Sequence, residues 1–99
     1  MIHDYAYVYL LGNFNRNVLY TGVTTDLKQR ITDHKNGIGS SFTQKYNIHI
    51  LLWYQSFERI EDAITREKQI KRWRREWKEK LIRDFNPDFK DLYFDMLEL

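Results

Sequence analysis

The sequence predicts an α+β fold in which helices flank a three-stranded antiparallel sheet, in the order β-β-α-β-α-α. Three short segments are rich in aromatic and β-branched residues and are bounded by turn-forming residues, as strands are. After the third segment the apolar period changes from 2 to 3.6, which indicates helix. At 99 residues, with 42% hydrophobic and 30% charged, the chain can build one core and is too apolar for disorder. We therefore expect a single domain over residues 1–99.

The first two predicted strands are residues 5–11 (YAYVYLL) and residues 18–22 (VLYTG). The segment between them begins with Gly12-Asn13-Phe14-Asn15, a cluster of residues that favour turns. Two strands joined by so short a connection predict a hairpin.

A first helix is predicted after the hairpin. Residues 24–26 (TTD) are good N-cap residues, and Leu27 and Ile31 follow with the spacing of four that places them on one helical face. The helix should end near Asn36-Gly37, because glycine is common just past a helix C-terminus. Residues 38–47 are expected to form a loop.

Residues 49–57 (HILLWYQSF) are the third predicted strand. From Arg59 to about Arg83 the pattern predicts one long helix or two. Asn86-Pro87 ends it, because proline fixes φ and disfavours helix at the preceding residue, and a short amphipathic stretch closes the chain. The apolar stripe of the helical segment is expected to contain Ile60, Ala63, Ile64 and Ile70, continued by Trp73, Trp77 and Leu81.

Glu67 lies on this apolar stripe, where a carboxylate needs a partner. A carboxylate withdrawn from water is paired, hydrogen-bonded or bound to a metal, or else it takes up a proton. One interpretation is a structural ion pair with Arg66, Lys71 or a basic side chain of another element. The other is a functional site, which requires further polar residues nearby.

Candidate partners for such a site lie on the first helix and the hairpin. Arg30 and His34 are four residues apart and should lie at the border of the buried face, although this spacing is also common on a surface. Tyr7 and Tyr9 share one face of the first strand, and Tyr20 lies on the second. Buried phenols are usually packing residues, so these tyrosines alone do not predict chemistry.

Charge is unevenly distributed although the net charge is only +2. Residues 66–83 hold nine basic side chains against three acidic ones, a local net of +6, whereas residues 84–99 carry a local net of −4. The basic segment fits contact with a polyanion, because lysine and arginine that neutralise phosphates release counterions. A solvated helix face that keeps a small protein in solution explains the same charges.

The chain has no cysteine, which excludes disulfides, thiolate zinc sites and a cysteine nucleophile and permits a reducing compartment. Residues 1–5 (MIHDY) lack the features of a signal peptide, and no stretch approaches the ~20 apolar residues of a membrane span. We therefore expect a cytoplasmic protein with no membrane partner.

Two tripeptides, Tyr7-Val8-Tyr9 and, ten residues later, Tyr20-Thr21-Gly22, resemble the paired motifs that give the GIY-YIG nuclease superfamily its name. Arg30 follows Tyr20 by ten residues, His34 follows four later, and Glu67 lies on a helix after a third strand, as in that family. The stretches 66–73 and 86–89 are similar to those of small stand-alone bacterial members, so the resemblance covers the whole chain.

The resemblance implies a role for each matching residue. Glu67 corresponds to the family's metal-binding carboxylate, Arg30 to its phosphate-binding arginine, and Tyr9 and Tyr20 to its motif tyrosines. His34 matches a position that often holds tyrosine or histidine.

The sequence also departs from the family pattern. Tyr7 stands where the family name has glycine, and Thr21 stands for isoleucine. Val23 occupies a place where the nuclease domain of bacterial excision-repair enzymes has lysine, and Asn86 is a weak match to a late asparagine of the family.

These residue types suit phosphodiester hydrolysis, which needs an activated water and neutralisation of charge on the phosphoryl oxygens. A carboxylate such as Glu67 is a hard ligand for Mg²⁺ or Mn²⁺, and the fork of Arg30 suits a phosphate. Tyr9, Tyr20 and His34 are all candidate proton acceptors, and the sequence does not rank them.

Nucleic-acid contacts are expected from the basic segment and from residues 40–46. Trp73 and Trp77 could stack on unpaired bases, although at this spacing on a helix they are more often core residues. The residues predicted to contact nucleic acid are Lys45, Lys71, Arg72, Arg74 and Arg75.

The expected function is that of a metal-dependent DNA endonuclease, structure-selective or weakly sequence-specific, acting in repair or recombination as a monomer or weak homodimer. The alternative is a nucleic-acid-binding module that keeps the fold without catalysis. The sequence does not distinguish DNA from RNA as the substrate.

Overall fold

A three-stranded antiparallel sheet forms the centre of the molecule in the computed structural model, which describes residues 5–96. The strands are β1 (Ala6–Gly12), β2 (Leu19–Thr24) and β3 (Ile50–Phe57), in the order β2-β1-β3. All three predicted strands are confirmed, with bounds displaced by one or two residues. The predicted features at residues 1–4 and at Glu98 lie outside the described residues.

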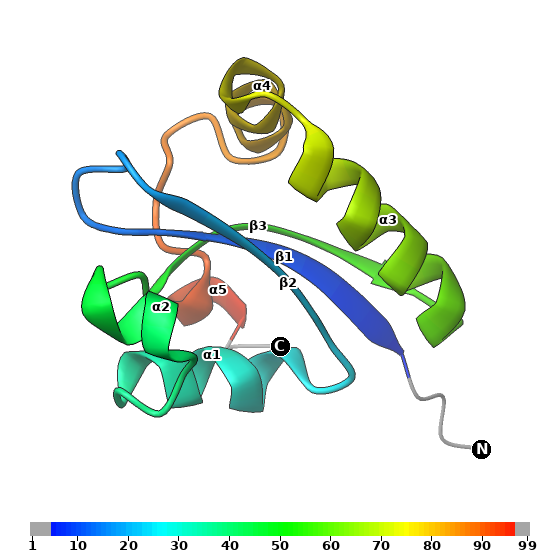
Figure 1. The fold of residues 1–99 in the computed structure, drawn as a ribbon, viewed down its shortest axis with the longest axis horizontal. Helices are drawn as coiled ribbons and strands as arrows, with labels where there is room; N and C mark the ends of the chain where they lie inside the picture. Colours follow the sequence, from blue (N-terminus) through cyan, green and yellow to red (C-terminus); the bar gives the residue numbers. More distant parts are fainter. Residues whose placement is uncertain (1–4, 97–99) are drawn as a thin grey trace.

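Helices cover both faces of this sheet (Figure 1). On one face lie α1 (Leu27–Lys35), α2 (Ser41–Lys45) and α5 (Tyr93–Met96). On the other lie α3 (Ile60–Arg72) and α4 (Arg75–Phe85). The predicted α+β class is therefore correct, whereas the predicted order lacks α2 and leaves the number of later helices open.

The first helix begins where its cap residues predict. The side chain of Asp26 accepts a hydrogen bond from the backbone N–H of Gln29 over 3.1 Å, which satisfies one of the unpaired donors of the first turn. At the other end, Gly37 adopts a φ of +77°, a conformation that glycine reaches without strain. The helix thus ends at the predicted place.

The expected loop at residues 38–47 is wrong in part, because it contains the five-residue helix α2. Ser40 caps this helix by accepting a hydrogen bond from the backbone N–H of Thr43 over 3.2 Å. A helix this short shows no 3.6 period in its sequence, and its cap lies among glycine and serine residues that suggest a loop.

The helical segment after β3 divides into two helices at Trp73 and Arg74. Both residues have extended backbone, with ψ of 147° and 162°, so the chain turns between α3 and α4. The second helix ends at Phe85, directly before Asn86-Pro87 as predicted.

The predicted apolar stripe of α3 is narrower than expected. Ala63, Glu67 and Ile70 are buried, whereas Ile60 and Ile64 are 38% and 37% exposed. Ala63, Glu67 and Ile70 follow one line along the helix in steps of four and three, and Ile60 and Ile64 flank that line at the edge of the contact with the sheet. Glu67 therefore occupies the middle of the buried face.

The sheet separates two apolar clusters. The cluster under α3 and α4 is built around Val8, Leu10, Leu52, Trp53, Ala63, Ile70 and Ile82. The cluster under α1 and α5 is built around Tyr9, Leu11, Leu27, Ile31, Ile48 and Leu51. Alternate residues of β1 enter opposite clusters, as the period of two requires, so Tyr9 faces α1.

Polar contacts attach the C-terminal segment to the sheet. Asn86 is 3% exposed, donates to the carbonyls of Leu52 and Lys90 over 3.1 and 2.8 Å, and accepts from the N–H of Lys90 over 3.2 Å. Asp91 pairs with Lys35 and accepts from the N–H of Leu51 over 3.1 Å. These bonds hold the segment that follows α4 against β3 and α1.

Candidate active site

Tyr9 lies at the centre of the candidate site, 1% exposed, on the face of the sheet that α1 covers. Its ring crosses the neighbouring strand at Gly22, its partner in the β1–β2 register. A Cβ atom at Gly22 would overlap the ring and hydroxyl of Tyr9. The glycine of the second tripeptide therefore makes room for the tyrosine of the first.

Arg30 reaches this tyrosine from α1. Its Nε donates to the Tyr9 hydroxyl oxygen over 3.5 Å, a long hydrogen bond. Burial raises the pKa of Tyr9; the bond from Arg30 opposes this shift, and the nearby Tyr20 and Glu67 add to it. Tyr9 is consequently a neutral phenol that orients Arg30.

His34 lies one turn further along α1 and is 6% exposed. Its ring makes edge contacts with the rings of Tyr9 and Tyr20, with centroids 6.2 and 6.0 Å away, and its Nδ1 lies 3.1 Å from the Thr43 hydroxyl. Burial lowers the pKa of His34, the charge of Arg30 lowers it further, and Asp33 opposes both effects. The imidazole is therefore neutral at physiological pH.

The short helix α2 forms the border of the site. Phe42 stacks on the partly exposed Tyr20 with a centroid distance of 6.3 Å and contacts Tyr46 at 4.9 Å. Lys45 is exposed and lies over the Tyr46 ring, 5.4 Å from its centroid. The predicted contact residue Lys45 is thus accessible on the same short helix that contacts Tyr20 through Phe42.

Glu67 approaches from α3, which covers the other face of the sheet. Its Oε2 lies 2.9 Å from Nζ of Lys71, one helical turn away, and its side chain retains 12% exposure. Its charge raises the pKa of Tyr9, but less than burial and Tyr20 do. The structure thus contains the ion pair that a structural interpretation predicts, with Glu67 on the opposite face of the sheet from Tyr9.

These residues fit a site for one divalent cation. Within residues 5–96 no three side chains of His, Cys, Asp or Glu come together as a metal cluster. Mg²⁺ needs fewer protein ligands, since one carboxylate with water and phosphate oxygens completes its octahedron. Glu67, whose side chain keeps 12% exposure, supplies such an oxygen.

Val23, the residue directly after the second tripeptide, is apolar and faces α3 and α4. Its side chain packs against the apolar cluster under α3 and α4, at the position where some family members have lysine. The chain therefore has an apolar contact there instead of a cation.

The predicted basic contact residues differ in their availability. Lys71 pairs with Glu67, and Arg75 pairs with Glu79 and donates to the backbone carbonyls of Arg16 and Asn17. Arg75 thus attaches the β1–β2 loop to α4, so its position serves the fold. Arg72 and Arg74 lie at the corner between α3 and α4 and are exposed. Arg74 also forms a solvent-exposed ion pair with Glu76, with 3.8 Å between Nε and Oε2.

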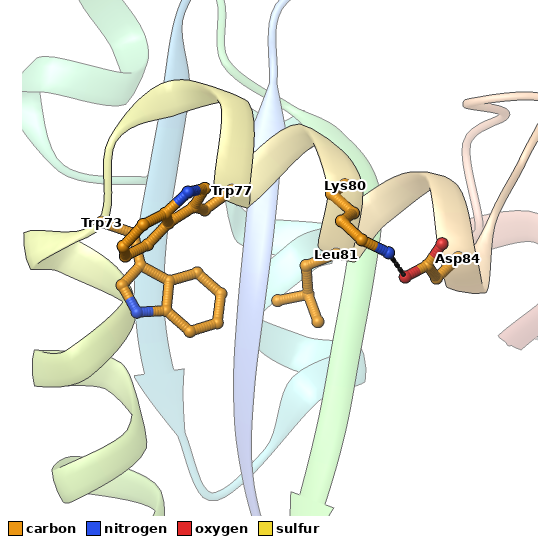
Figure 2. Close-up of a pocket in the computed structure, with 5 residues that line it drawn as sticks. All are labelled: Trp73, Trp77, Lys80, Leu81 and Asp84. Carbon is orange, nitrogen blue, oxygen red and sulfur yellow. Dashed lines mark hydrogen bonds and ion pairs between the residues drawn. The ribbon is translucent and has the colours of Figure 1, made fainter.

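A hollow beside the tryptophans lies at the same corner (Figure 2). Trp73 and Trp77 meet edge to face with centroids 6.2 Å apart, and Trp77 is 53% exposed. Leu81 lines the hollow, and Lys80 with its partner Asp84 lies on its rim. The expectation that both tryptophans are core residues is wrong for Trp77.

Two members of the site were not recognised in the sequence. Thr43 holds the ring of His34, and Gly39 leaves space for both, because a Cβ atom at Gly39 would overlap His34 Nδ1 and Thr43 Oγ1. The residues lie in a segment expected to be loop, so no periodic signal could place them beside α1.

Comparisons with known proteins identify the family of the chain. A family model described as the GIY-YIG catalytic domain matches residues 5–80. A UPF0213 protein of Haloquadratum walsbyi is 34% identical over 83 residues, 84% of this chain and 92% of the relative. A UPF0213 protein of Staphylococcus haemolyticus is 35% identical over 78 residues, 79% of this chain and 94% of the relative.

A solved structure is also similar. The solution NMR structure of a UPF0213 protein from Bacillus halodurans has 30% sequence identity and a TM-score of 0.56, covering 88% of this chain and 92% of that one. Within residues 5–96 no helix is long and apolar enough to cross a membrane. By family model, sequence identity and fold, the chain belongs to the GIY-YIG catalytic domain family.

Proposed function

We propose that this chain is a single-domain, metal-dependent endonuclease that hydrolyses phosphodiester bonds in DNA, structure-selectively or with weak sequence preference. The observation that carries the proposal is the convergence of Arg30, His34, Tyr9 and Tyr20 on one face of the sheet. Glu67, the carboxylate of the family pattern, lies on α3. Such a group has the parts that phosphodiester hydrolysis needs.

Glu67 is the residue that would hold Mg²⁺ or Mn²⁺. When bound, the cation neutralises charge on the phosphoryl oxygens and lowers the pKa of bound water. Lys71, 54% exposed, can turn into solvent and leave the Glu67 carboxylate available.

Arg30 is the residue that would bind the scissile phosphate. Its Nε donates to Tyr9, and Tyr20 also interacts with the guanidinium; both tyrosines raise the pKa of Arg30, so a charged fork is available to phosphate oxygens. The same bond fixes the orientation of the guanidinium before substrate arrives, which lowers the entropy lost on binding.

Among the three candidate proton acceptors, Tyr9 is the least suited. It is 1% exposed and its pKa is raised by burial, so its phenolate is rare at neutral pH. His34 is neutral and therefore has a lone pair to offer, and Tyr20 is partly exposed beside it.

Nucleic acid would contact two surfaces beside these residues. Lys45 lies on α2, the helix whose Phe42 stacks on Tyr20, and Arg72 and Arg74 lie at the corner between α3 and α4. The exposed ring of Trp77 beside these arginines offers a surface on which an unpaired base can stack. Substrates with unpaired segments should therefore bind better than plain duplex.

The Lys71–Glu67 ion pair favours one alternative, a nucleic-acid-binding module without catalysis, because a carboxylate neutralised by lysine attracts a cation less strongly. Cleavage assays with single-stranded, duplex and branched DNA and with RNA, each with Mg²⁺, Mn²⁺ or chelator, test the proposal. We expect metal-dependent cleavage of DNA that Glu67→Gln abolishes. Binding without cleavage under every condition would support the alternative.

A further inference from the structure

The hydroxyl of Thr43 has its proton committed away from His34. Thr43 is 3% exposed, and its Oγ1 donates to the backbone carbonyl of Ser40 over 2.9 Å. A hydroxyl has one proton to donate and two lone pairs. A carbonyl only accepts, so the proton of Oγ1 points to the carbonyl oxygen of Ser40. The Ser40 hydroxyl, 3.2 Å from Oγ1, can then only donate to one of the two lone pairs, and the other faces His34.

The ring of His34 must complement that lone pair. Its Nδ1 lies 3.1 Å from Oγ1 of Thr43, so Nδ1 is the donor and carries the proton. In a neutral imidazole one nitrogen is a donor and the other an acceptor. Nε2 is then the acceptor, and its lone pair lies on the side of the ring away from Thr43.

Nε2 is buried, and no residue of the described part of the chain forms a hydrogen bond with it. It is the one buried side-chain nitrogen or oxygen without a partner among residues 5–96. A buried polar atom without a partner costs free energy, so its retention suggests that it serves a purpose other than folding.

Gly39 is a second observation that supports the contact between His34 and Thr43. A Cβ atom there would overlap Nδ1 of His34 and Oγ1 of Thr43 together, so only glycine allows the two atoms to approach each other. The hydrogen bond between His34 on α1 and Thr43 on α2 therefore depends on a glycine in the segment that connects the two helices.

We propose that Thr43 is a positioning residue that fixes His34 as the Nδ1–H tautomer and thereby presents Nε2 as the proton acceptor of the cleavage reaction. The inference rests on the proposed function and names the acceptor that the function leaves open. As the water oxygen bonds to phosphorus, its proton passes to the Tyr20 hydroxyl. The rings of Tyr20 and His34 are in edge contact, and on substrate binding the hydroxyl comes within hydrogen-bond reach of Nε2 and gives its own proton to it. The bond from phosphorus to the leaving ester oxygen breaks, and that oxygen keeps the electron pair.

The groups around the ring are compatible with this role. Arg30 and Asp33 lie on the same helix, Tyr9 and Tyr20 face the ring from β1 and β2, and Thr43 faces it from α2. Burial and Arg30 lower the pKa of His34, so the ring is neutral and its tautomer is defined at physiological pH.

NMR of the ¹⁵N-labelled full chain tests the tautomer without substrate or metal. The chain has three histidines, and His34→Gln identifies the signals of His34 by their loss. We expect wild-type His34 to show a protonated Nδ1 and an unprotonated Nε2 at neutral pH. A protonated Nε2 in the wild type would overturn the proposal, whatever the behaviour of any variant.

Two substitutions at Thr43 separate positioning from packing. Thr43→Val keeps the shape but removes the lone pair, and we expect it to yield a mixture of tautomers or the Nε2–H form. Thr43→Ser keeps the hydroxyl and should restore the Nδ1–H form. An unchanged tautomer in a folded Thr43→Val, checked by its amide spectrum, would count against the role of Thr43.

Cleavage measurements address the catalytic part separately. Thr43→Val should lower kcat by about tenfold or more and leave KM nearly unchanged, with recovery in Thr43→Ser. The acid limb of the pH profile of kcat should also shift, because that limb reports protonation of His34. If the wild type shows the predicted tautomer but no cleavage, the positioning stands and the proposed function fails. Equal kcat in wild type and Thr43→Val, with the tautomer changed, would refute Nε2 as the acceptor.

Discussion

Glu67 and Lys71 form an ion pair on α3, with 2.9 Å between Oε2 and Nζ, in which the acid is almost buried and the base is half exposed. This asymmetry distinguishes the pair from a fully buried one. If Glu67 loses its charge, the lysine can extend into solvent, so little free energy of unfolding depends on the pair.

Glu67→Gln should therefore abolish metal-dependent cleavage while nucleic-acid binding persists, because the amide keeps the volume but loses the charge that attracts Mg²⁺. Without metal, its free energy of unfolding should lie within about 1 kcal/mol of wild type. Lys71→Gln is the matched control and should retain cleavage and require less Mg²⁺. Thermal unfolding, binding and cleavage are measured on all three proteins; a strongly destabilised Glu67→Gln that cleaves normally would contradict the assignment.

Arg30→Lys should reduce cleavage by roughly 10²- to 10³-fold, the range found for loss of one donor to a transition-state oxyanion. Lysine keeps the charge but loses both the bond to Tyr9 and the fork that binds phosphate. Lys28→Gln, an exposed change on the same helix, is the control and should have nearly wild-type kcat. Single-turnover kinetics decide, and wild-type rates in Arg30→Lys would remove its proposed role.

Combined replacement of Arg72 and Arg74 by glutamine should weaken binding to all sequences alike and lower the salt dependence. Loss of two phosphate contacts reduces the slope of log K against log salt by roughly 1.4 to 1.8. Arg59→Gln with Lys90→Gln removes the same charge from residues paired with acids elsewhere, and this control should keep the wild-type slope. Equal slopes in both double variants would exclude the α3–α4 corner as the binding surface.

Trp77→Leu should weaken binding of single-stranded DNA more than binding of duplex, because stacking on one base contributes about 1 to 3 kcal/mol. The tryptophan fluorescence of the wild type should be quenched by single-stranded oligonucleotides, and most of that response should disappear in the variant. Phe94→Leu, an equally exposed ring on α5, is the control. Equal losses for single strand and duplex would exclude stacking at Trp77.

Asn86→Ala should destabilise the fold by about 2 kcal/mol or more, because it leaves buried backbone groups of Leu52 and Lys90 without partners. Cleavage per folded molecule should not change, since the side chain makes structural bonds. Gln55→Ala, at an exposed position of β3, is the control and should have nearly the wild-type free energy of unfolding. Loss of cleavage in a folded Asn86→Ala would instead support a catalytic role for Asn86.

The strands, the first helix and the end of α4 were predictable because each is specified by local chemistry. Asp26 caps α1, and Asn86-Pro87 ends α4 through restrictions that act on neighbouring residues. Helix α2 was missed because five residues are too few for a period. Ile60 and Ile64 were assigned to the core because the period of an amphipathic helix does not reveal how wide the covering sheet is.

For the candidate site, spacing predicted that Arg30 and His34 share a side of α1, and the structure places both beside Tyr9. The contacts of Thr43, Gly39 and Asn86 were not predictable in the same way. Each depends on a chain crossing that brings distant segments together, such as Asn86 with Leu52. Spacing along one element carries no information about such crossings.

The central place of β1 has a consequence during synthesis of the chain. This strand is made first and can pair early with β2, but its other partner is complete only when Phe57 has been added. At roughly 5 to 20 residues per second, about 2 to 9 s separate Gly12 from Phe57. For that time one edge of β1, with Val8 and Leu10 uncovered by α3, is open to other nascent chains. Substitutions that weaken β3 should therefore lower the yield of protein on the ribosome before they lower the stability of finished molecules.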